Sequence, residues 1–121
     1  MSLKTVATRF VELCRQGKNF DVMRTMYAPD IVSVEGDGKE TAGQGPVIKK
    51  SEVWGAAREF HGETVAGPFY NSANPDQFTV FFTFDVTPRS TGKRTTLEEI
   101  GVYTVKGDKI TREQFFYEGE H

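Results

Sequence analysis

The stretch from Asp76 to Tyr117, DQFTVFFTFDVTPRSTGKRTTLEEIGVYTVKGDKITREQFFY, decides the fold. It contains three strand patterns in succession, at residues 77–87, 93–105 and 109–118. In the first pattern apolar side chains alternate with mostly polar ones, which is the period of a strand with one apolar face. Pro88 ends that strand, the turn at residues 89–92 follows, and Gly107-Asp108 is a two-residue hairpin signal before the third pattern. The stretch therefore predicts an antiparallel meander.

The two turns predict the pairing of the strands if both hairpins close tightly. Closing on Gly107-Asp108 gives the pairs Val105–Ile110, Tyr103–Arg112, Gly101–Gln114 and Glu99–Phe116. Closing on residues 89–92 gives the pairs Phe84–Leu97 and Phe82–Glu99. One face is then expected to collect Phe78, Val80, Phe82, Phe84, Leu97, Tyr103, Val105, Ile110 and Phe116. A slip of one residue would move every one of these side chains to the other face.

Glu99, Arg112 and Gln114 share this otherwise apolar face in the predicted register. An unpaired buried charge costs on the order of several kcal/mol, so these groups need partners or water, and they predict a cavity. Glu99 is the first candidate for a general acid or base, because apolar neighbours disfavour its charged form. Tyr103 and Gln114 could donate hydrogen bonds to a developing oxyanion.

The same residues allow structural interpretations. Glu99 could form an ion pair with Arg112 or Lys50, or lie in solvent at an edge, and Tyr103 and Gln114 could be satisfied polar groups of the core. If Glu99 pointed to the convex side, the candidates would become Asp85 and Glu113 in place of Glu99, Tyr103 and Gln114.

Length and charge set the broad class of the protein. A chain of 121 residues has the size of one domain, expected here over residues 1–121, and can form one core. The net charge is −2 and the basic residues are scattered, which disfavours nucleic acid as a partner. The sequence shows no signal peptide and no apolar run of about 18 residues, so a soluble, cytoplasmic protein is expected. Its lone Cys14 falls on the apolar stripe of a helix, which favours a buried thiol over a nucleophile.

The first half of the chain predicts three helices. Residues 2–16 carry apolar side chains at three- and four-residue steps, and Gly17 ends that helix. A shorter helix begins after Asn19 and directs Tyr27 inward, so that Tyr27 can border the pocket. A short strand, residues 31–35, and a polar, glycine-rich segment, residues 36–45, come next, and the segment is expected to be a mobile loop.

The third helix is predicted over residues 47–61, after Pro46. One stripe (Val53, Ala56, Ala57, Phe60) is typical of core, and a second (Val47, Lys50, Trp54, Ala57, His61) could border a cavity. Trp54 would form an apolar wall or fill the core, and His61 could shuttle protons or simply favour a helix C-terminus. Glu35 could enter the cavity mouth or be solvated. Residues 64–71 predict an edge strand in which Gly67 and Pro68 allow a bulge.

No motif predicts a metal or a cofactor. The two histidines and scattered acids have no H-E-x-x-H or Cys/His spacing, and no Gly-x-Ser-x-Gly segment is present. The opposite face of the predicted meander is too apolar to be exposed to solvent. It carries Thr79, Phe81, Thr83, Ile100, Val102, Phe115 and Tyr117. A second subunit is expected to cover it.

The order of two helices, a short strand, a third helix and four antiparallel strands resembles the nuclear-transport-factor-2-like (cystatin-like α+β) superfamily, and within it the SnoaL-like branch. The resemblance rests on Tyr27-Ala28-Pro29-Asp30-Ile31-Val32, Gly45, the run from Tyr103 to Ile110, and Phe115-Phe116-Tyr117. It implies an α+β fold in which three helices pack on a curved sheet of four to five strands, antiparallel or mixed, that forms a cone around a pocket. Members of this superfamily include cyclases, isomerases, dehydratases and epoxide hydrolases, as well as proteins with no assigned activity.

The resemblance also implies acid/base chemistry without a metal or organic cofactor, and dimerisation through the outer sheet face. The Asp/His pair of cyclase-like members has no residue-for-residue match here. Two functions therefore remain open. One is a lyase- or isomerase-type enzyme acting on a small, partly apolar molecule with Glu99 and His61 as acid/base residues. The other is a non-catalytic ligand-binding or dimer-scaffold protein. In both, the pocket is expected to be bordered by Tyr27, Glu35, Lys50, Trp54, Tyr103, Arg112 and Gln114.

Overall fold

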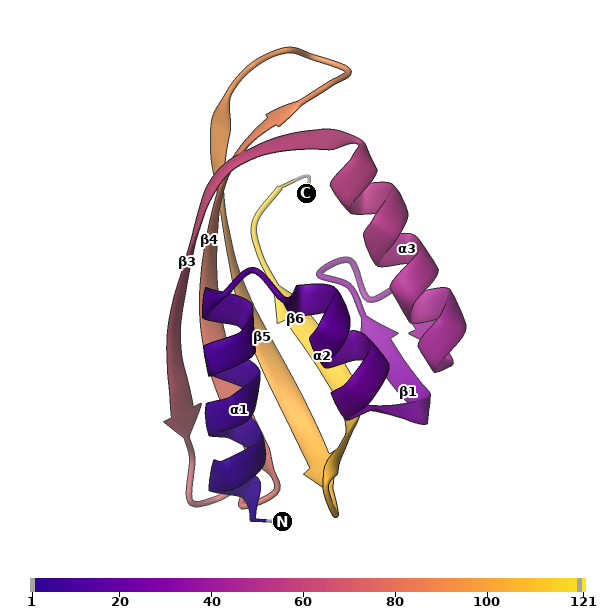
Figure 1. Ribbon diagram of the computed structural model, residues 1–121, viewed down its shortest axis with the longest axis vertical. Coiled ribbons are helices and arrows are strands. Elements are labelled where there is room, and N and C mark those ends of the chain that lie inside the picture. The colour runs from indigo at the N-terminus through magenta and orange to yellow at the C-terminus, as the bar shows by residue number, and fades with distance from the viewer. Residues whose placement is uncertain (1, 120) are drawn as a thin grey trace.

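The computed structural model describes residues 2–119 and 121. Its elements are α1 (Leu3–Arg15), α2 (Asn19–Met26), β1 (Tyr27–Val34), β2 (Glu40–Ala42), α3 (Gln44–Ala56), β3 (Arg58–Tyr70), β4 (Gln77–Pro88), β5 (Thr95–Lys106) and β6 (Lys109–Phe116). The sheet has the order β2-β1-β6-β5-β4-β3, in which β1 and β6 are parallel and all other neighbours antiparallel. Figure 1 shows the helices on one side of this curved sheet. The predicted α+β class is confirmed, with six strands rather than four to five.

The first helix forms for the reason that its sequence suggests. Ser2 caps it, because the side-chain oxygen of Ser2 accepts a hydrogen bond from the backbone N–H of Thr5 at 3.2 Å. Its buried stripe consists of Val6, Ala7, Phe10, Val11 and Cys14, and it packs against β3 and β4. Among the described residues, no helix combines the length and apolar character needed to cross a membrane.

The predicted third helix is wrong at its C-terminal end. α3 stops at Ala56, and Phe60 and His61 belong to β3, where Phe60 pairs with Val86 of β4. Gly55 weakens the last helical turn, and the long strand β4 needs a partner along its second half, so strand pairing prevails over helix propensity. The predicted core stripe on this helix is also wrong, since Val53 is 59% exposed and Phe60 is 45% exposed.

The glycine-rich segment after β1 contains a strand that its sequence did not reveal. Residues 40–42 form β2, which pairs antiparallel with β1 through Val32–Ala42, Ser33–Thr41 and Val34–Glu40. β3 is likewise longer than predicted and begins at Arg58. The bulge expected at Gly67 and Pro68 is confirmed by the register shift between Ala66 and Phe69.

The predicted meander register is confirmed for one hairpin and wrong for the other. β4 and β5 pair as expected, with Phe82 opposite Glu99 and Phe84 opposite Leu97. In the second hairpin Val105 lies opposite Ile110, but the register shifts by one residue between Thr104 and Val105, so that Tyr103 lies opposite Glu113 rather than Arg112. A bulge of this kind adds one residue to one strand and reverses the faces beyond it.

The bulge changes which side chains of β6 face the helices. Glu113 is 1% exposed and Phe115 is packed against the core, whereas Phe116 is 50% exposed on the outer face. Arg112 and Gln114 lie opposite Thr104 and Val102 on that same outer face. The prediction that Arg112, Gln114 and Phe116 share the inner face is therefore wrong.

Candidate functional site

A cavity of about 1080 Å³ lies between the inner face of the sheet, the three helices and the chain that follows β6. This volume is large enough for a drug-sized organic molecule. Aromatic and aliphatic side chains form most of its walls: Phe10, Phe20, Val22, Met23, Trp54, Phe60, Phe82, Phe84 and Phe115. The rings of Phe82 and Phe84 lie nearly parallel with centroids 5.8 Å apart, and Trp54 and Phe60 approach Phe84 edge-on. The cavity is therefore suited to an apolar molecular body.

Glu99 lies on the wall of the cavity with a histidine beside it. Its side chain is 13% exposed, and its Oε2 lies 3.1 Å from Nε2 of His121, whose side chain is 8% exposed. Glu99 forms no ion pair with lysine or arginine among the residues that the structure describes. Neither the structural pair with Arg112 nor the one with Lys50 is formed, because Arg112 is on the other face and Lys50 bonds elsewhere.

A second carboxyl group, Glu113, lies deeper in the site. The hydroxyl of Tyr27, the first residue of β1, donates a hydrogen bond to Oε1 of Glu113. Both residues are almost fully buried, at 3% and 1% exposed. Burial raises the pKa of Glu113 above its usual range, and burial together with the charge of Glu113 raises the pKa of Tyr27. The deep end thus favours a protonated carboxylic acid.

Lys50 links this end to the cavity mouth. Its Nζ donates a hydrogen bond to Oγ of Ser33 at 2.7 Å and pairs with Oε1 of Glu35. The hydroxyl of Tyr117 donates to the other oxygen of Glu35 at 3.2 Å. The single cation of this group is therefore already neutralised by Glu35, and the carboxylate is held from two sides.

A further glutamate, Glu63 of β3, faces the cavity near α2. Its surface is exposed, but the cavity walls remove part of its water and so raise its pKa, and the negative charge of Glu99 adds to that effect. Glu63 lies opposite Phe84, and Glu99 lies opposite Phe82, so the two carboxyl groups flank the Phe82–Phe84 pair. Sequence reasoning had given Glu63 no role.

Trp54 lies on α3 and borders the cavity as its predicted helix stripe suggests, whereas His61 lies in β3 instead of on that helix. The guanidinium of Arg58 lies 4.3 Å from the centroid of the Trp54 ring, and its Nη1 donates to the Trp54 carbonyl at 3.0 Å. His61 borders the cavity from β3, but its Nε2 lies 2.7 Å from Oγ1 of Thr87 in an exposed contact. The ring of His61 is therefore engaged away from Glu99.

Seven of the nine predicted site residues border the cavity. They are Tyr27, Glu35, Lys50, Trp54, His61, Glu99 and Tyr103. Tyr103 is 2% exposed, and its ring stacks on Phe78 with centroids 5.1 Å apart. Arg112 and Gln114 do not border it, because the bulge in β6 turns them outward. Asp85 lies outside as expected and forms two hydrogen bonds with Arg94, at 2.7 and 2.9 Å.

The residues that sequence reasoning missed share a cause. Glu113, which the sequence offered only as an alternative to Glu99, belongs to the polar run 111–114, in which no apolar alternation marks a face. Phe115, Phe116 and Tyr117 are three consecutive aromatics, so their order does not indicate which one points inward. His121 follows the last strand and has no periodic signal at all. Glu113 faces inward only because of the bulge in β6, and the sequence carries no mark of that bulge.

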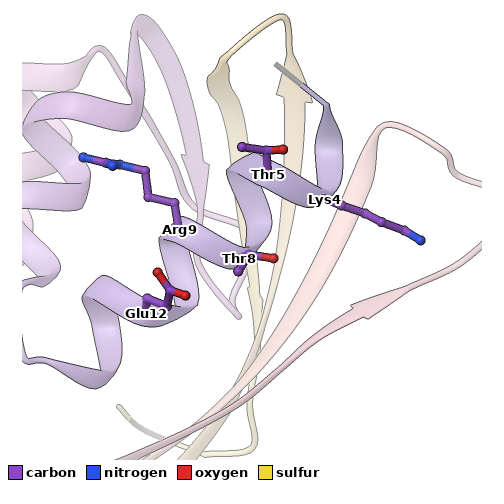
Figure 2. Close-up of a pocket in the computed structure, with 5 residues that line it drawn as sticks. All are labelled: Lys4, Thr5, Thr8, Arg9 and Glu12. Carbon is purple, nitrogen blue, oxygen red and sulfur yellow. The ribbon is translucent and has the colours of Figure 1, made fainter.

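A second hollow, over the outer surface of α1, does not form a site. Its side chains are Lys4, Thr5, Thr8, Arg9 and Glu12, all from one helix. Figure 2 shows Lys4 and Arg9 extending in opposite directions, so their charges do not converge on one point. Across residues 2–119 and 121, no group of three histidine, cysteine or acidic side chains is arranged to hold a metal ion.

Comparison with known proteins identifies the family. The sequence model of one protein family, described as SnoaL-like domain, matches residues 1–117. The chain belongs to the SnoaL-like family. A crystal structure from Mesorhizobium loti, provisionally described as a SnoaL-like polyketide cyclase and also labelled carbohydrate phosphatase, is 42% identical with a TM-score of 0.89, and the match covers 97% of this SnoaL-like chain and 100% of that one.

More distant structures share the SnoaL-like fold. A provisional polyketide cyclase from Pseudomonas putida is 12% identical with a TM-score of 0.74, covering 98% of this chain and 92% of that one. A provisional isomerase from Bacillus subtilis is 16% identical with a TM-score of 0.75, covering 98% and 90%. At these identities the likeness concerns the fold alone. No curated protein is significantly similar in sequence.

Proposed function

We propose that this protein binds a small, partly apolar organic molecule in the cavity and transfers a proton on it, as an isomerase, cyclase or dehydratase without a cofactor does. The observation that carries the proposal is Glu99 on an aromatic wall with His121 at 3.1 Å and no lysine or arginine ion pair among the described residues. A scaffold protein would instead be expected to lock this carboxylate to a fixed cation.

The simplest chemistry needs only one carboxylate. Glu99 removes a proton from a carbon next to a carbonyl group, and the C–H electron pair shifts to form an enolate. The carboxylic acid that results returns the same proton to another carbon of that molecule, so atoms and charge balance. His121 orients the carboxylate and, when it is protonated, offsets negative charge in the site. The apolar walls exclude water, which strengthens both interactions.

Binding is testable through Trp54, which is the only tryptophan of the chain and borders the cavity. An aromatic ketone with an acidic C–H, 2-tetralone, is a suitable first probe. A saturable change of Trp54 fluorescence is expected on titration. Absence of saturable binding by 2-tetralone and by its alcohol, 2-tetralol, would contradict the proposed ligand class.

Catalysis is tested by following deuterium uptake of 2-tetralone from heavy water by NMR. Exchange above the buffer rate is expected, and Glu99→Gln should lower this enzymatic rate about 100-fold with binding retained. The matched control is Glu98→Gln, because Glu98 is exposed and pairs with Thr83 on the other face of the same strand. Equal loss in both variants would contradict the role of Glu99.

A second candidate function is ligand binding without chemistry. It is favoured by the deep polar groups, since Tyr27, Glu113, Lys50 and Glu35 already satisfy one another. Saturable fluorescence changes with no exchange above the buffer rate would support this candidate and exclude proton transfer on the probe.

A further inference from the structure

The chain after β6 brings a residue from outside the sheet to Glu99. Figure 1 shows the chain continuing past β6 and then curving toward α3. Tyr117 and His121 both border the cavity, and their rings stack with centroids 3.8 Å apart and planes 17° apart. His121 in turn reaches Glu99 at 3.1 Å. The position of His121 therefore depends on Tyr117.

Two contacts fix the Tyr117 ring. Its hydroxyl donates to Oε2 of Glu35, whose other oxygen is held by Lys50 of α3. Its ring lies against Gly36, where an added Cβ would stand 2.7–2.9 Å from three ring atoms. The φ of Gly36 is not positive, so glycine is needed here for space and not for backbone freedom. Burial raises the pKa of Tyr117, which keeps the phenol protonated as a donor to Glu35.

His121 itself retains unused hydrogen-bonding capacity. Its side chain is 8% exposed, yet neither Nδ1 nor Nε2 has a hydrogen-bond partner among the described residues, since the approach of Nε2 to Glu99 at 3.1 Å is a close contact without hydrogen-bond geometry. A buried imidazole nitrogen without a partner is costly, which is consistent with a ligand group completing the site.

We propose that Tyr117 is a positioning residue that, seated on Gly36 and bonded to Glu35, holds His121 against Glu99 and leaves Nδ1 of His121 for the ligand. This inference rests on the proposed function for its kinetic consequences, but its geometry can be tested without turnover. Lys50, Glu35, Tyr117, His121 and Glu99 then form one connected path from α3 to β5.

The first experiment uses NMR of the free protein. Stacking on Tyr117 should shift the ring protons of His121 upfield, and Tyr117→Leu should abolish that shift, whereas Tyr117→Phe, which keeps the ring, should retain most of it. Gly36→Ala should displace the ring and reduce the shift. The matched control is Gly45→Ala, because a Cβ at Gly45 meets no atom within 4 Å. Unchanged chemical shifts of the His121 ring protons in Tyr117→Leu would overturn the proposal. This test does not depend on Gly36→Ala and therefore still holds if that variant fails to fold.

The second experiment separates positioning from packing. With 2-tetralone, Tyr117→Leu should lower kcat for deuterium exchange about 10- to 100-fold with KM nearly unchanged, and Tyr117→Phe should recover much of it. Tyr70→Leu is the control for loss of a tyrosine ring, because Tyr70 is 44% exposed at the far end of β3. Exchange that requires Glu99 but is unaffected by Tyr117→Leu overturns this inference and leaves the proposed function standing. The reverse pattern, a lost His121 shift in a protein without exchange, contradicts only the proposed function.

Discussion

Cys14 shows how the surroundings of one side chain set its chemistry. The thiol is 3% exposed on α1, and burial, together with the charges of Glu63 and Glu113, raises its pKa to about 12. At pH 8 only about one thiol in 10,000 would then be ionised, compared with roughly a quarter for a free cysteine. We therefore expect a disulfide reagent to label the folded protein about 1000-fold more slowly than the urea-unfolded chain. Since Cys14 is the sole cysteine, the absorbance of the released thiol measures it directly, and fast stoichiometric labelling of the folded state would contradict its burial.

Glu113 predicts a specific pH dependence of stability. Its pKa is raised in the folded state from the ordinary value of 4.5, so the folded protein keeps a proton that the unfolded chain releases. The free energy of unfolding should therefore fall as pH rises above about 4.5, until the folded-state pKa is passed. Each unit of the shift corresponds to about 1.4 kcal/mol.

Glu113→Gln removes this titration and keeps an oxygen that accepts the hydrogen bond of Tyr27. Urea unfolding between pH 4.5 and 8 should show a flatter decline for Glu113→Gln than for the wild type. The decline should not vanish, because Glu63 also has a raised pKa. Glu98→Gln should keep the wild-type slope, and an equally steep decline in Glu113→Gln would show that Glu113 is not the titrating group.

Within β5, Gly101 and Tyr103 form a local packing unit. The Tyr103 ring lies over Gly101, where an added Cβ would stand 2.6 Å from the Tyr103 hydroxyl oxygen. Tyr103 is also fixed by stacking on Phe78, so its ring has little room to move. Gly101→Ala should therefore lower the free energy of unfolding by roughly 1–3 kcal/mol. Gly62→Ala, another strand position but with no atom within 4 Å of the new Cβ, should cost less in the same urea titration. Equal stability of the two variants would contradict this packing.

The elements also show where sequence reasoning works. In β4 one apolar side chain recurs at every second position, so its faces and its register with β5 followed from the sequence. In β6 the polar run 111–114 carries no such pattern, and one extra residue reversed the faces of Glu113 and Gln114. The boundary of α3 failed for a related reason: residues 57–61 suit a helix locally, but β4 supplies a strand partner far away in sequence.

At the scale of the whole molecule, the candidate site joins segments that no local pattern connects. Glu35 follows β1, Lys50 comes from α3, Glu99 from β5, and His121 from the end of the chain. Sequence periodicity placed Glu99 and Lys50 on the inner side, because each belongs to a regular element. It could not place His121, whose position depends on a ring stack and on the space left by Gly36.

The outer face of the sheet leads to a prediction about assembly. Phe81, Ile100 and Phe116 form a row across β4, β5 and β6, since Phe81 pairs with Ile100 and Ile100 with Phe116. Ile100 is 38% exposed and Phe116 is 50% exposed. The bulge in β6 removes Phe115 and Tyr117 from this face, so Phe116 takes the place that the sequence had suggested for Phe115. Sheet faces this apolar are commonly covered by a second subunit.

We accordingly expect a homodimer that forms through this row. Sedimentation at micromolar concentration should give twice the chain mass of 13.6 kDa. Phe116→Asp places a charge where an aromatic side chain would be buried, and should weaken association by roughly 2 kcal/mol or more, about 30-fold in the dissociation constant.

Tyr70→Asp is the control. It adds the same charge on the helix side of the sheet, at a site that is 44% exposed next to Lys4, and should leave association unchanged. A wild-type protein that sediments as a monomer, or a Phe116→Asp variant that associates as tightly as Tyr70→Asp, would exclude this face as the interface. Phe116 is next to Phe115 and Tyr117, which border the cavity. The Phe116→Asp variant should therefore also be titrated with 2-tetralone while Trp54 fluorescence is recorded. This titration distinguishes loss of the dimer from loss of the cavity.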